Sequence, residues 1–372
     1  VGGATRDRNE LFLSTIPEMG DEGRLPPPLD GVGDKLTDGF LSEVLRNGAS
    51  DRPYMQTRMP KFGDGAKHLR EAFVQVDRRN EAEPARFEEP VHRVKAVGRQ
   101  LVGDKGLACI KCHTLGKHKA TGIQAIGLDT MHRRLREDWF LRYLFDPNAY
   151  RPGTRMPTGF PEGQATVRDV YDGDPQRQIT AIWEYLRDGE RAGIPEGLIA
   201  EMIELKPTTE PILDRDFIEG LSPRGFAVGD PVLAHLAWDV NRMCLGLVWH
   251  GRFIDASKHW VGRGPGFQTP LGDHILRIEE SVPFAVLASR DAPWPKEQPR
   301  DAGYRFRGYR LDAERRPTFL YEGPEFSVAD QPVPVRRDED ACFRRRSTVT
   351  TPAACEGLYF RAARGAKMEA LE

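Results

Sequence analysis

The residues best suited to chemistry are two cysteines and a histidine that lie close together in the chain. Cys109, Cys112 and His113 form a C-x-x-C-H sequence. Two thiols at this spacing can add across the two vinyl groups of one haem, and the adjoining imidazole can bind the iron from the same side. Covalent attachment then holds a cofactor that a small core could not retain by packing alone. The sequence therefore predicts a covalently bound haem here.

Two other kinds of site use paired cysteines. A thioredoxin-like redox pair begins a helix directly after a buried strand, and no strand pattern precedes Cys109. A zinc site needs a second pair of ligands, for which His118 and His132 offer only a loose match. Both alternatives stay open, but the complete motif favours haem.

A six-coordinate haem also needs a ligand on the opposite face of the iron. Met156 follows the motif in a loop framed by two prolines. A thioether sulfur favours ferrous iron and raises the reduction potential, which suits electron transfer. A single methionine more often fills a gap in a core, and Met131 with His132 forms a weaker rival pair. The position between prolines favours Met156 as the distal ligand.

Helical periodicity surrounds these candidates. Thr37 is a good N-cap for a helix that ends before Gly48, and the charged run at 77–90 indicates a linker. The apolar spacing predicts helices over residues 38–47, 66–76, 91–102, 137–145 and 177–187.

An internal repeat crosses the first half of the chain. Residues 52–60 and 151–157 both begin with Arg-Pro and end with Arg-Met-Pro, and Phe-Leu pairs precede them at 40–41 and 140–141. The copies are 100 positions apart at the Phe-Leu pair and 97 at the methionine. A repeat of this size indicates a duplicated domain rather than a solenoid.

Over residues 91–190 the chain resembles the class I c-type cytochromes. The likeness rests on the C-x-x-C-H motif, the Arg-Met-Pro loop and a helix at each end. It implies that Cys109 and Cys112 form thioethers to haem c, with His113 as the proximal and Met156 as the distal iron ligand.

The resemblance also implies a close crossing of the first and last helices. Gly98 is the expected residue of the first helix at this crossing. Its expected neighbour on the last helix is Trp183 or Tyr185.

The N-terminal lobe, residues 1–90, departs from the family pattern because no cysteine precedes Met59. Either the attachment motif of a second haem lies upstream of Val1, in a longer chain or another subunit, or the lobe has lost its haem and survives as a packing partner. The close match of the two Arg-Met-Pro sequences favours the first explanation, in which Met59 ligates a second haem.

Residues 208–372 show the alternating pattern of antiparallel strands. A change of apolar parity at Gly308 predicts a β-bulge. The region resembles the β-rich modules fused to cytochrome domains in large bacterial multidomain cytochromes, some of which accompany sugar or alcohol dehydrogenases. Its tryptophans could line a carbohydrate platform, although core packing is the simpler interpretation. They are Trp238, Trp249, Trp260 and Trp294.

Three cysteines lie outside the motif. Cys244 is expected as a buried free thiol in a strand. Cys342 and Cys355 could close a small loop in an oxidising compartment.

Composition excludes several classes of protein. The 372 residues carry 54 Lys and Arg against 56 Asp and Glu, so no strong field favours nucleic acid. No apolar run approaches the roughly 20 residues of a membrane span. Arg133, Arg134 and Arg136 could form a basic rim for an acidic redox partner, with a solvated helix end as the simpler interpretation.

The expected architecture is therefore two all-α cytochrome c-like lobes, one incomplete (1–90) and one complete (91–195), followed by an all-β antiparallel sandwich or barrel (208–372). The expected function is electron transfer through a His/Met-ligated haem c, in the periplasm or another extracytoplasmic space, with a redox partner protein such as a dehydrogenase. The alternatives are the electron-accepting part of a haem-dependent or sugar- or alcohol-oxidising enzyme assembly, and a carbohydrate-binding module joined to a haem domain.

Overall fold

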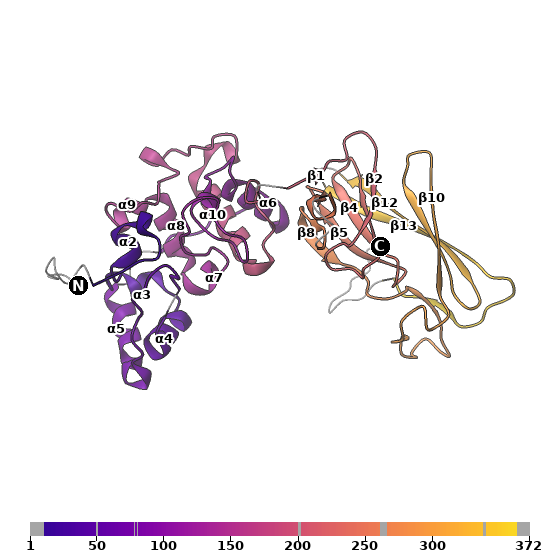
Figure 1. Cartoon of the computed structure of the whole chain (residues 1–372), viewed down its shortest axis with the longest axis horizontal. Coiled ribbons are helices and arrows are strands. Elements are labelled where there is room, and N and C mark those ends of the chain that lie inside the picture. The colour runs from indigo at the N-terminus through magenta and orange to yellow at the C-terminus, as the bar shows by residue number, and fades with distance from the viewer. Residues whose placement is uncertain are drawn as a thin grey trace. The chain divides into compact units, whose positions relative to one another are not determined.

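The computed structural model describes residues 11–49, 51–77, 79, 81–199, 202–260, 266–337 and 340–362. The chain divides into two compact units between residues 200 and 201. The first unit is helical and the second contains antiparallel sheets (Figure 1). The predicted order, helices first and strands after, is confirmed. Both expected helical lobes fall within the first unit.

The helices of the first unit begin and end close to the predicted positions. The ranges predicted at 38–47, 91–102 and 137–145 coincide with α4, α6 and α8, and the other two differ by at most two residues. The helices are α2 (Asp21–Arg24), α3 (Val32–Lys35), α4 (Asp38–Asn47), α5 (Lys67–Asp77), α6 (Val91–Val102), α7 (Met131–Arg134), α8 (Glu137–Phe145), α9 (Pro147–Tyr150) and α10 (Pro175–Leu186). Short 3-10 turns lie at Pro17–Met19, Gly63–Ala66, Cys109–Lys111, Pro161–Gly163, Tyr171–Gly173 and Gly189–Arg191.

Local capping explains where these helices start and stop. The hydroxyl of Thr37 accepts a hydrogen bond from the backbone N–H of Phe40, and Gly48 ends α4 with a φ of 74°. The carboxylate of Asp174 likewise accepts from the N–H of Arg177 at the start of α10. Each cap satisfies a backbone group that the helix itself leaves unpaired.

Helices α6 and α10 cross at Gly98, as the resemblance implied. A Cβ on Gly98 would lie 2.0 Å from the carbonyl oxygen of Ala181 and 2.7 Å from the Cβ of Tyr185. Of the two expected neighbours, the structure therefore selects Tyr185, with Ala181 even closer. Only glycine permits this approach of the two backbones.

Helix α8 supplies much of the core beside this crossing. Trp139, Phe140, Leu141 and Leu144 are buried, and the ring of Phe140 lies 5.0 Å from that of Trp183 on α10. Helices α3, α4 and α5 lie together in a separate, smaller cluster (Figure 1).

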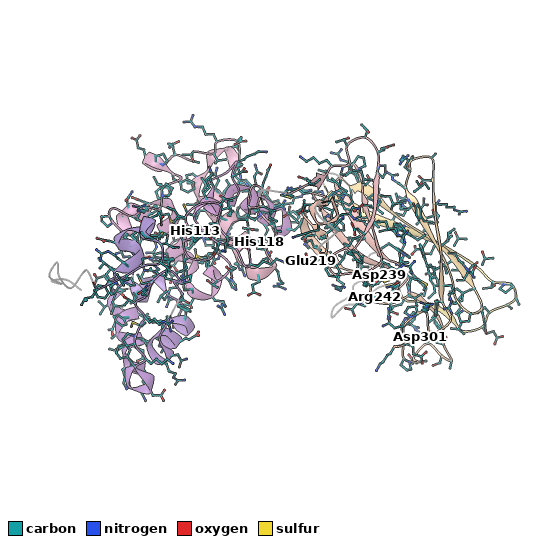
Figure 2. The ribbon with its side chains drawn as sticks, in the orientation of Figure 1. His113, His118, Glu219, Asp239, Arg242 and Asp301 are labelled. Atoms are coloured by element: carbon teal, nitrogen blue, oxygen red, sulfur yellow. The ribbon has the colours of Figure 1, made fainter. Side chains whose placement is uncertain are left out.

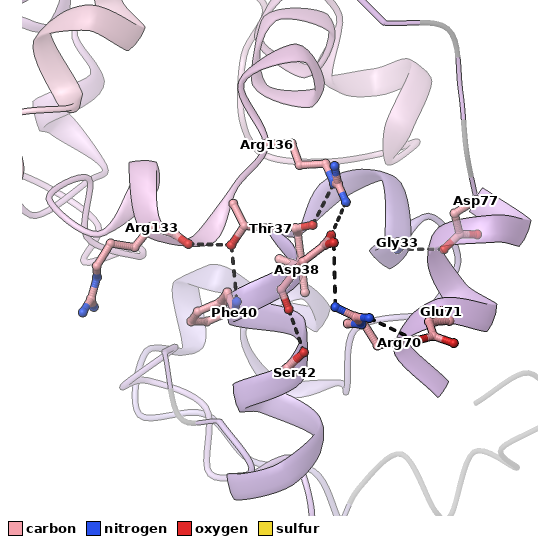
Figure 3. Close-up of polar contacts among 11 residues, drawn as sticks. Gly33, Thr37, Asp38, Phe40, Ser42, Arg70, Glu71, Asp77, Arg133 and Arg136 are labelled. Atoms are coloured by element: carbon pink, nitrogen blue, oxygen red, sulfur yellow. Dashed lines mark hydrogen bonds and ion pairs between the residues drawn. The ribbon is translucent and has the colours of Figure 1, made fainter. Parts of the chain in front are cut away.

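The two copies of the repeat meet at a short antiparallel bridge between Leu36 and Leu135. The N–H of Thr37 donates to the carbonyl of Arg134, and the N–H of Arg136 donates to the carbonyl of Lys35, both at 3.0 Å. Such reciprocal bonds are those of an antiparallel strand pair, and they tie the two copies together. Figure 3 shows further contacts here, including the hydroxyl of Thr37 donating to the carbonyl of Arg133 at 2.7 Å.

The bridge corrects the alignment of the repeat. Helices α3 and α4 correspond to α7 and α8 with an offset of 99 positions, because Leu36 and Leu135 each follow a four-residue helix. The predicted offset of 100 at the Phe-Leu pairs is wrong by one position. At an offset of 99, buried Leu41 corresponds to buried Phe140.

The second unit consists of antiparallel sheets, as predicted. The larger sheets have the strand orders β2-β3-β4-β5-β8 and β10-β11-β12-β13, and the smaller ones are β1-β6-β7 and β14-β9. The elements are β1 (Glu204–Leu205), β2 (Ile212–Asp216), β3 (Gly225–Gly229), β4 (Ala234–Asp239), β5 (Cys244–His250), β6 (Ile254–Asp255), α11 (Ser257–Trp260), β7 (Thr269–Pro270), β8 (Asp273–Arg277), β9 (Phe284–Val286), β10 (Arg305–Leu311), β11 (Pro317–Glu322), β12 (Ser327–Arg337), β13 (Asp340–Thr350) and β14 (Leu358–Phe360).

The two larger sheets share one hydrophobic core, as in a sandwich. Trp238 of β4 stacks on Phe319 of β11 with ring centroids 4.5 Å apart. Trp238 and Trp249 are buried, so core packing rather than a sugar platform explains both. The side chain of Trp260 lies outside the described residues. The bulge predicted at Gly308 is confirmed by a register shift between β10 and β11.

The loop that Cys342 and Cys355 could have closed is not formed in the structure. Cys244 is buried on β5, as predicted, while Cys342 and Cys355 are free thiols. Strand β13 holds the chain extended from Cys342 to Thr350, over about 26 Å. The next five residues can return by at most about 17 Å, whereas the two Cα atoms of a disulfide lie within about 7 Å. A Cys342–Cys355 bridge would therefore require part of β13 to unfold.

Candidate haem site

The C-x-x-C-H motif forms a tight turn after α6 in the helical unit. Cys109–Lys111 is a 3-10 turn, entered through Ala108 in the left-handed region at a φ of 54°. The N–H groups of Cys112 and His113 both donate to the carbonyl of Cys109, at 3.1 and 2.9 Å. The element that precedes the turn is a helix, whereas a thioredoxin-like pair follows a strand.

His113, labelled in Figure 2, is held with its proton on Nδ1, which leaves Nε2 free to bind iron. Its Nδ1 lies 2.8 Å from the carbonyl oxygen of Ile126. A carbonyl can only accept, so Nδ1 carries the proton and the lone pair resides on Nε2. Burial lowers the pKa of His113 and keeps the imidazole neutral. A neutral ring oriented through its other nitrogen is typical of metal-bound histidine.

The thiol of Cys109 is not poised for redox exchange. Burial raises its pKa to about 12. Thiolate is the reactive form in disulfide exchange, and catalytic pairs have lowered pKa values. This environment disfavours the thioredoxin alternative. It is compatible with a sulfur that reacts a single time, to form a thioether.

Met156 lies in a loop tethered to the N-terminal part of the chain. Its N–H donates to the hydroxyl of Thr154 at 3.3 Å. Glu22 accepts from the N–H of Arg155 at 3.1 Å and pairs with the guanidinium of Arg151 at 2.9 Å. These bonds hold the loop while Met156, half-buried, packs against the same core as Cys109.

The rival Met131 packs against that core as well. Its sulfur, however, accepts a hydrogen bond from Arg134 at 3.5 Å. No such bond engages the sulfur of Met156 within the described chain. The contacts therefore favour Met156 as the free thioether.

Met59 belongs to a different cluster. It packs on Leu41, Leu45 and Ala66 of the smaller core around α4 and α5, and Cys109 and Met156 belong to the larger one. The structure therefore brings Met156, and not Met59, to the core beside the C-x-x-C-H turn.

The donor set fits a haem better than it fits zinc. Two free thiols, an imidazole with an available Nε2 and a half-buried thioether are the groups that haem c uses. Over the described residues, no three His, Cys, Asp or Glu side chains are grouped to hold a metal ion. His132, one of the loose zinc candidates, has its buried Nδ1 without a partner.

Sequence reasoning missed a group of cations beside this site. Arg134 and Arg136, expected at an exposed rim or helix end, instead lie at the repeat junction. Arg136 donates to the carbonyl of Leu36 at 3.0 Å, and Arg134 is half-buried with its Nε unpartnered. The signal that could have found the group is the repeat itself, because Arg52 and Arg151 occupy the same position in its two copies.

Comparison with models of known families, with curated proteins and with solved structures gave no match. No helix in the described ranges combines the length and apolar character needed to cross a bilayer.

Proposed function

We propose that this chain is an electron-transfer protein that carries haem c on Cys109 and Cys112, with His113 and Met156 as axial ligands. The observation that carries the proposal is the hydrogen bond from His113 Nδ1 to the carbonyl of Ile126. It directs the free lone pair of a neutral imidazole away from the backbone, next to two free thiols in a C-x-x-C-H turn. Haem attachment by this motif takes place outside the cytoplasm, which implies a periplasmic or other extracytoplasmic location.

When bound, the haem supplies a one-electron redox centre. The chain's own residues position it and exclude other ligands. The Ile126 carbonyl keeps the His113 ring in one orientation, and the Glu22 tether keeps the Met156 loop closed over the core. Ligation by both His113 and Met156 would leave no open position for a substrate, and the bound group would supply electron transfer to a redox partner protein, such as a dehydrogenase.

Two parts of the proposal extend beyond this site. Met59 is the candidate ligand of a second haem whose attachment motif would lie in another segment or subunit. The β unit is proposed as an accessory module of the same electron-transfer protein.

The test is the full-length protein produced in a host that attaches haem c. Mass spectrometry should report one covalent haem, or two if an upstream segment supplies a second motif. The oxidised protein should show the weak band at the red end of the spectrum that marks Met ligation. Met156→Ala should abolish this band, and the control Met131→Leu should retain it. A chain without covalent haem would overturn the proposal.

An enzyme with an open distal site makes the opposite prediction. Its oxidised spectrum would be high-spin before any mutation, and added cyanide or azide would bind as readily to wild type as to Met156→Ala. Tight exclusion of these ligands by wild type alone supports electron transfer.

A further inference from the structure

Four cations meet where the two copies of the repeat join. Lys35 and Arg134 occupy equivalent positions on either side of the Leu–Leu bridge, each as the last residue of a four-residue helix. Arg52 and Arg151 are also equivalent, because each begins the Arg-Pro segment of its copy. We call these four residues the junction cations.

Three of the junction cations form no ion pair within 4 Å among the described residues, although the carboxylate of Asp51 is near enough to act on Arg134. Arg151 pairs with Glu22 at 2.9 Å. Arg52 Nη1 and Arg134 Nε are buried without any hydrogen-bond partner. The ammonium of Lys35 lies 4.7 Å above the ring of Trp139 on α8, a contact that does not neutralise its charge.

The neighbouring cations disfavour the charged form of Lys35. Burial, reinforced by the fields of Arg52, Arg134 and Arg151, lowers the pKa of Lys35 to about 7. Burying several like charges without counter-ions is costly, so such a cluster calls for an anion.

The cluster lies beside the residues that would hold the proposed haem. Arg134 ends α7, and its guanidinium donates to the sulfur of Met131, which packs against the same core as Cys109. Arg151 begins the loop that carries Met156, and its guanidinium pairs with Glu22, which also accepts from the N–H of Arg155 in that loop. The junction cations are therefore placed to meet the edge of a group held between these elements.

We propose that Lys35, Arg52 and Arg134 hold the propionate carboxylates of the haem attached at Cys109 and Cys112. The inference rests on the proposed function, since it requires that haem. The N-terminal copy of the repeat then completes the haem site of the second copy by contributing two of the three cations. No covalent step is involved, and the contacts are charge-assisted hydrogen bonds.

This arrangement has a measurable consequence for the haem. Positive charge near the iron stabilises the ferrous state, and bonds to the propionates withdraw their negative charge from it. Loss of one junction cation should therefore lower the midpoint potential and change the vibrations of the propionates.

The experiment uses the full-length holoprotein and two neighbouring arginines of α7. Arg134→Gln removes a junction cation, while the matched control Arg133→Gln removes an exposed charge from the same helix. We expect Arg134→Gln to shift the midpoint potential downward and to shift the propionate bending band in resonance Raman spectra. Arg133→Gln should leave both close to wild type.

Two further variants make the result independent of folding defects. Arg134→Lys places at this position the residue that its equivalent, Lys35, already uses, and should restore most of the potential. Arg52→Gln should repeat the effect of Arg134→Gln from the other copy of the repeat. If haem is attached with Met ligation but the potential and the Raman band of these variants match the Arg133→Gln control, the propionate assignment is wrong and the proposed function stands. A chain without covalent haem would instead overturn the proposed function.

Discussion

Gly98 of α6 and Ala181 of α10 are so close that a methyl group on Gly98 would lie 2.0 Å from the Ala181 carbonyl oxygen. The obstacle is backbone, which cannot rotate away as a side chain could. Gly98→Ala should therefore force the two helices apart and lower the free energy of unfolding by about 2–4 kcal/mol. Denaturant unfolding of the full-length protein, followed by helical circular dichroism, measures the loss.

Gly39 provides the matched control for that prediction. It also lies in a helix, α4, but no atom comes within 4 Å of its added Cβ. Gly39→Ala should raise stability by about 0.5–1 kcal/mol, because alanine favours the helix. Equal effects of the two substitutions would show that the α6–α10 crossing is looser than described.

A second prediction concerns the ion pair that joins the two copies of the repeat. Arg142 of α8 donates to both carboxylate oxygens of Asp34, at 2.8 and 3.2 Å, and Asp34 is buried. Arg142→Met should lower the free energy of unfolding by about 3–5 kcal/mol, because it leaves a buried carboxylate almost uncompensated. In contrast, Arg46→Met removes an exposed pair with Asp64 and should cost about 0–1 kcal/mol. Calorimetry of both variants compares them directly.

The β unit contains a similar buried network around Arg345. This guanidinium bonds both oxygens of Asp330, at 2.9 and 3.0 Å, and reaches Glu279 at 2.8 Å. Both carboxylates are buried. Arg345→Met should destabilise the protein by about 3–5 kcal/mol, whereas Arg344→Met, on the exposed face of the same strand, should change little. Similar urea midpoints for the two variants would contradict this account.

The buried His235 predicts a pH dependence. Its Nδ1 accepts from the N–H of Asp230 at 3.2 Å, and its Nε2 lies 2.8 Å from the carbonyl of Gly251. Burial lowers its pKa from 6.5 to about 4. Between these values the unfolded chain binds the extra proton, so the stability contribution is complete above pH 6.5 and is lost as the pH falls toward 4.

The shift corresponds to roughly 3 kcal/mol over that range. Unfolding free energies measured from pH 7 to 4 should therefore fall more steeply for wild type than for His235→Gln, which retains a donor and an acceptor but no titratable ring. An imidazole resonance of His235 that titrates near its ordinary value in NMR would refute the prediction.

Local signals in the sequence were enough to predict where most of the longer helices begin and end. The ranges of α6 and α8 were predicted to the residue, because Pro90 and Gly103 flank the first and Asp146 with Pro147 ends the second. The bulge at Gly308 was likewise predicted, because the apolar side chains change faces of the strand there, and the structure shows the register shift. Such features depend on neighbours within a few positions, so the sequence contains them directly.

Predictions that depended on contacts between residues far apart in the sequence were less accurate. Cys342 and Cys355 are close in sequence, yet β13 holds them apart because its partner strand β12 keeps the chain extended. The offset of the repeat was off by one at the helix, since only the Leu36–Leu135 bridge shows which residues correspond. Neither outcome is encoded within a short window of the chain.

For this protein the sequence alone determined the C-x-x-C-H motif, the paired Arg-Met-Pro loops and the change from helices to strands. Tertiary structure decided which methionine shares a core with the motif, which nitrogen of His113 is free, and that Lys35 and Arg52 converge on Arg134. The physical reason is that electrostatics and burial act through space. A cation is exposed or buried, paired or unpaired, according to what the fold brings near it.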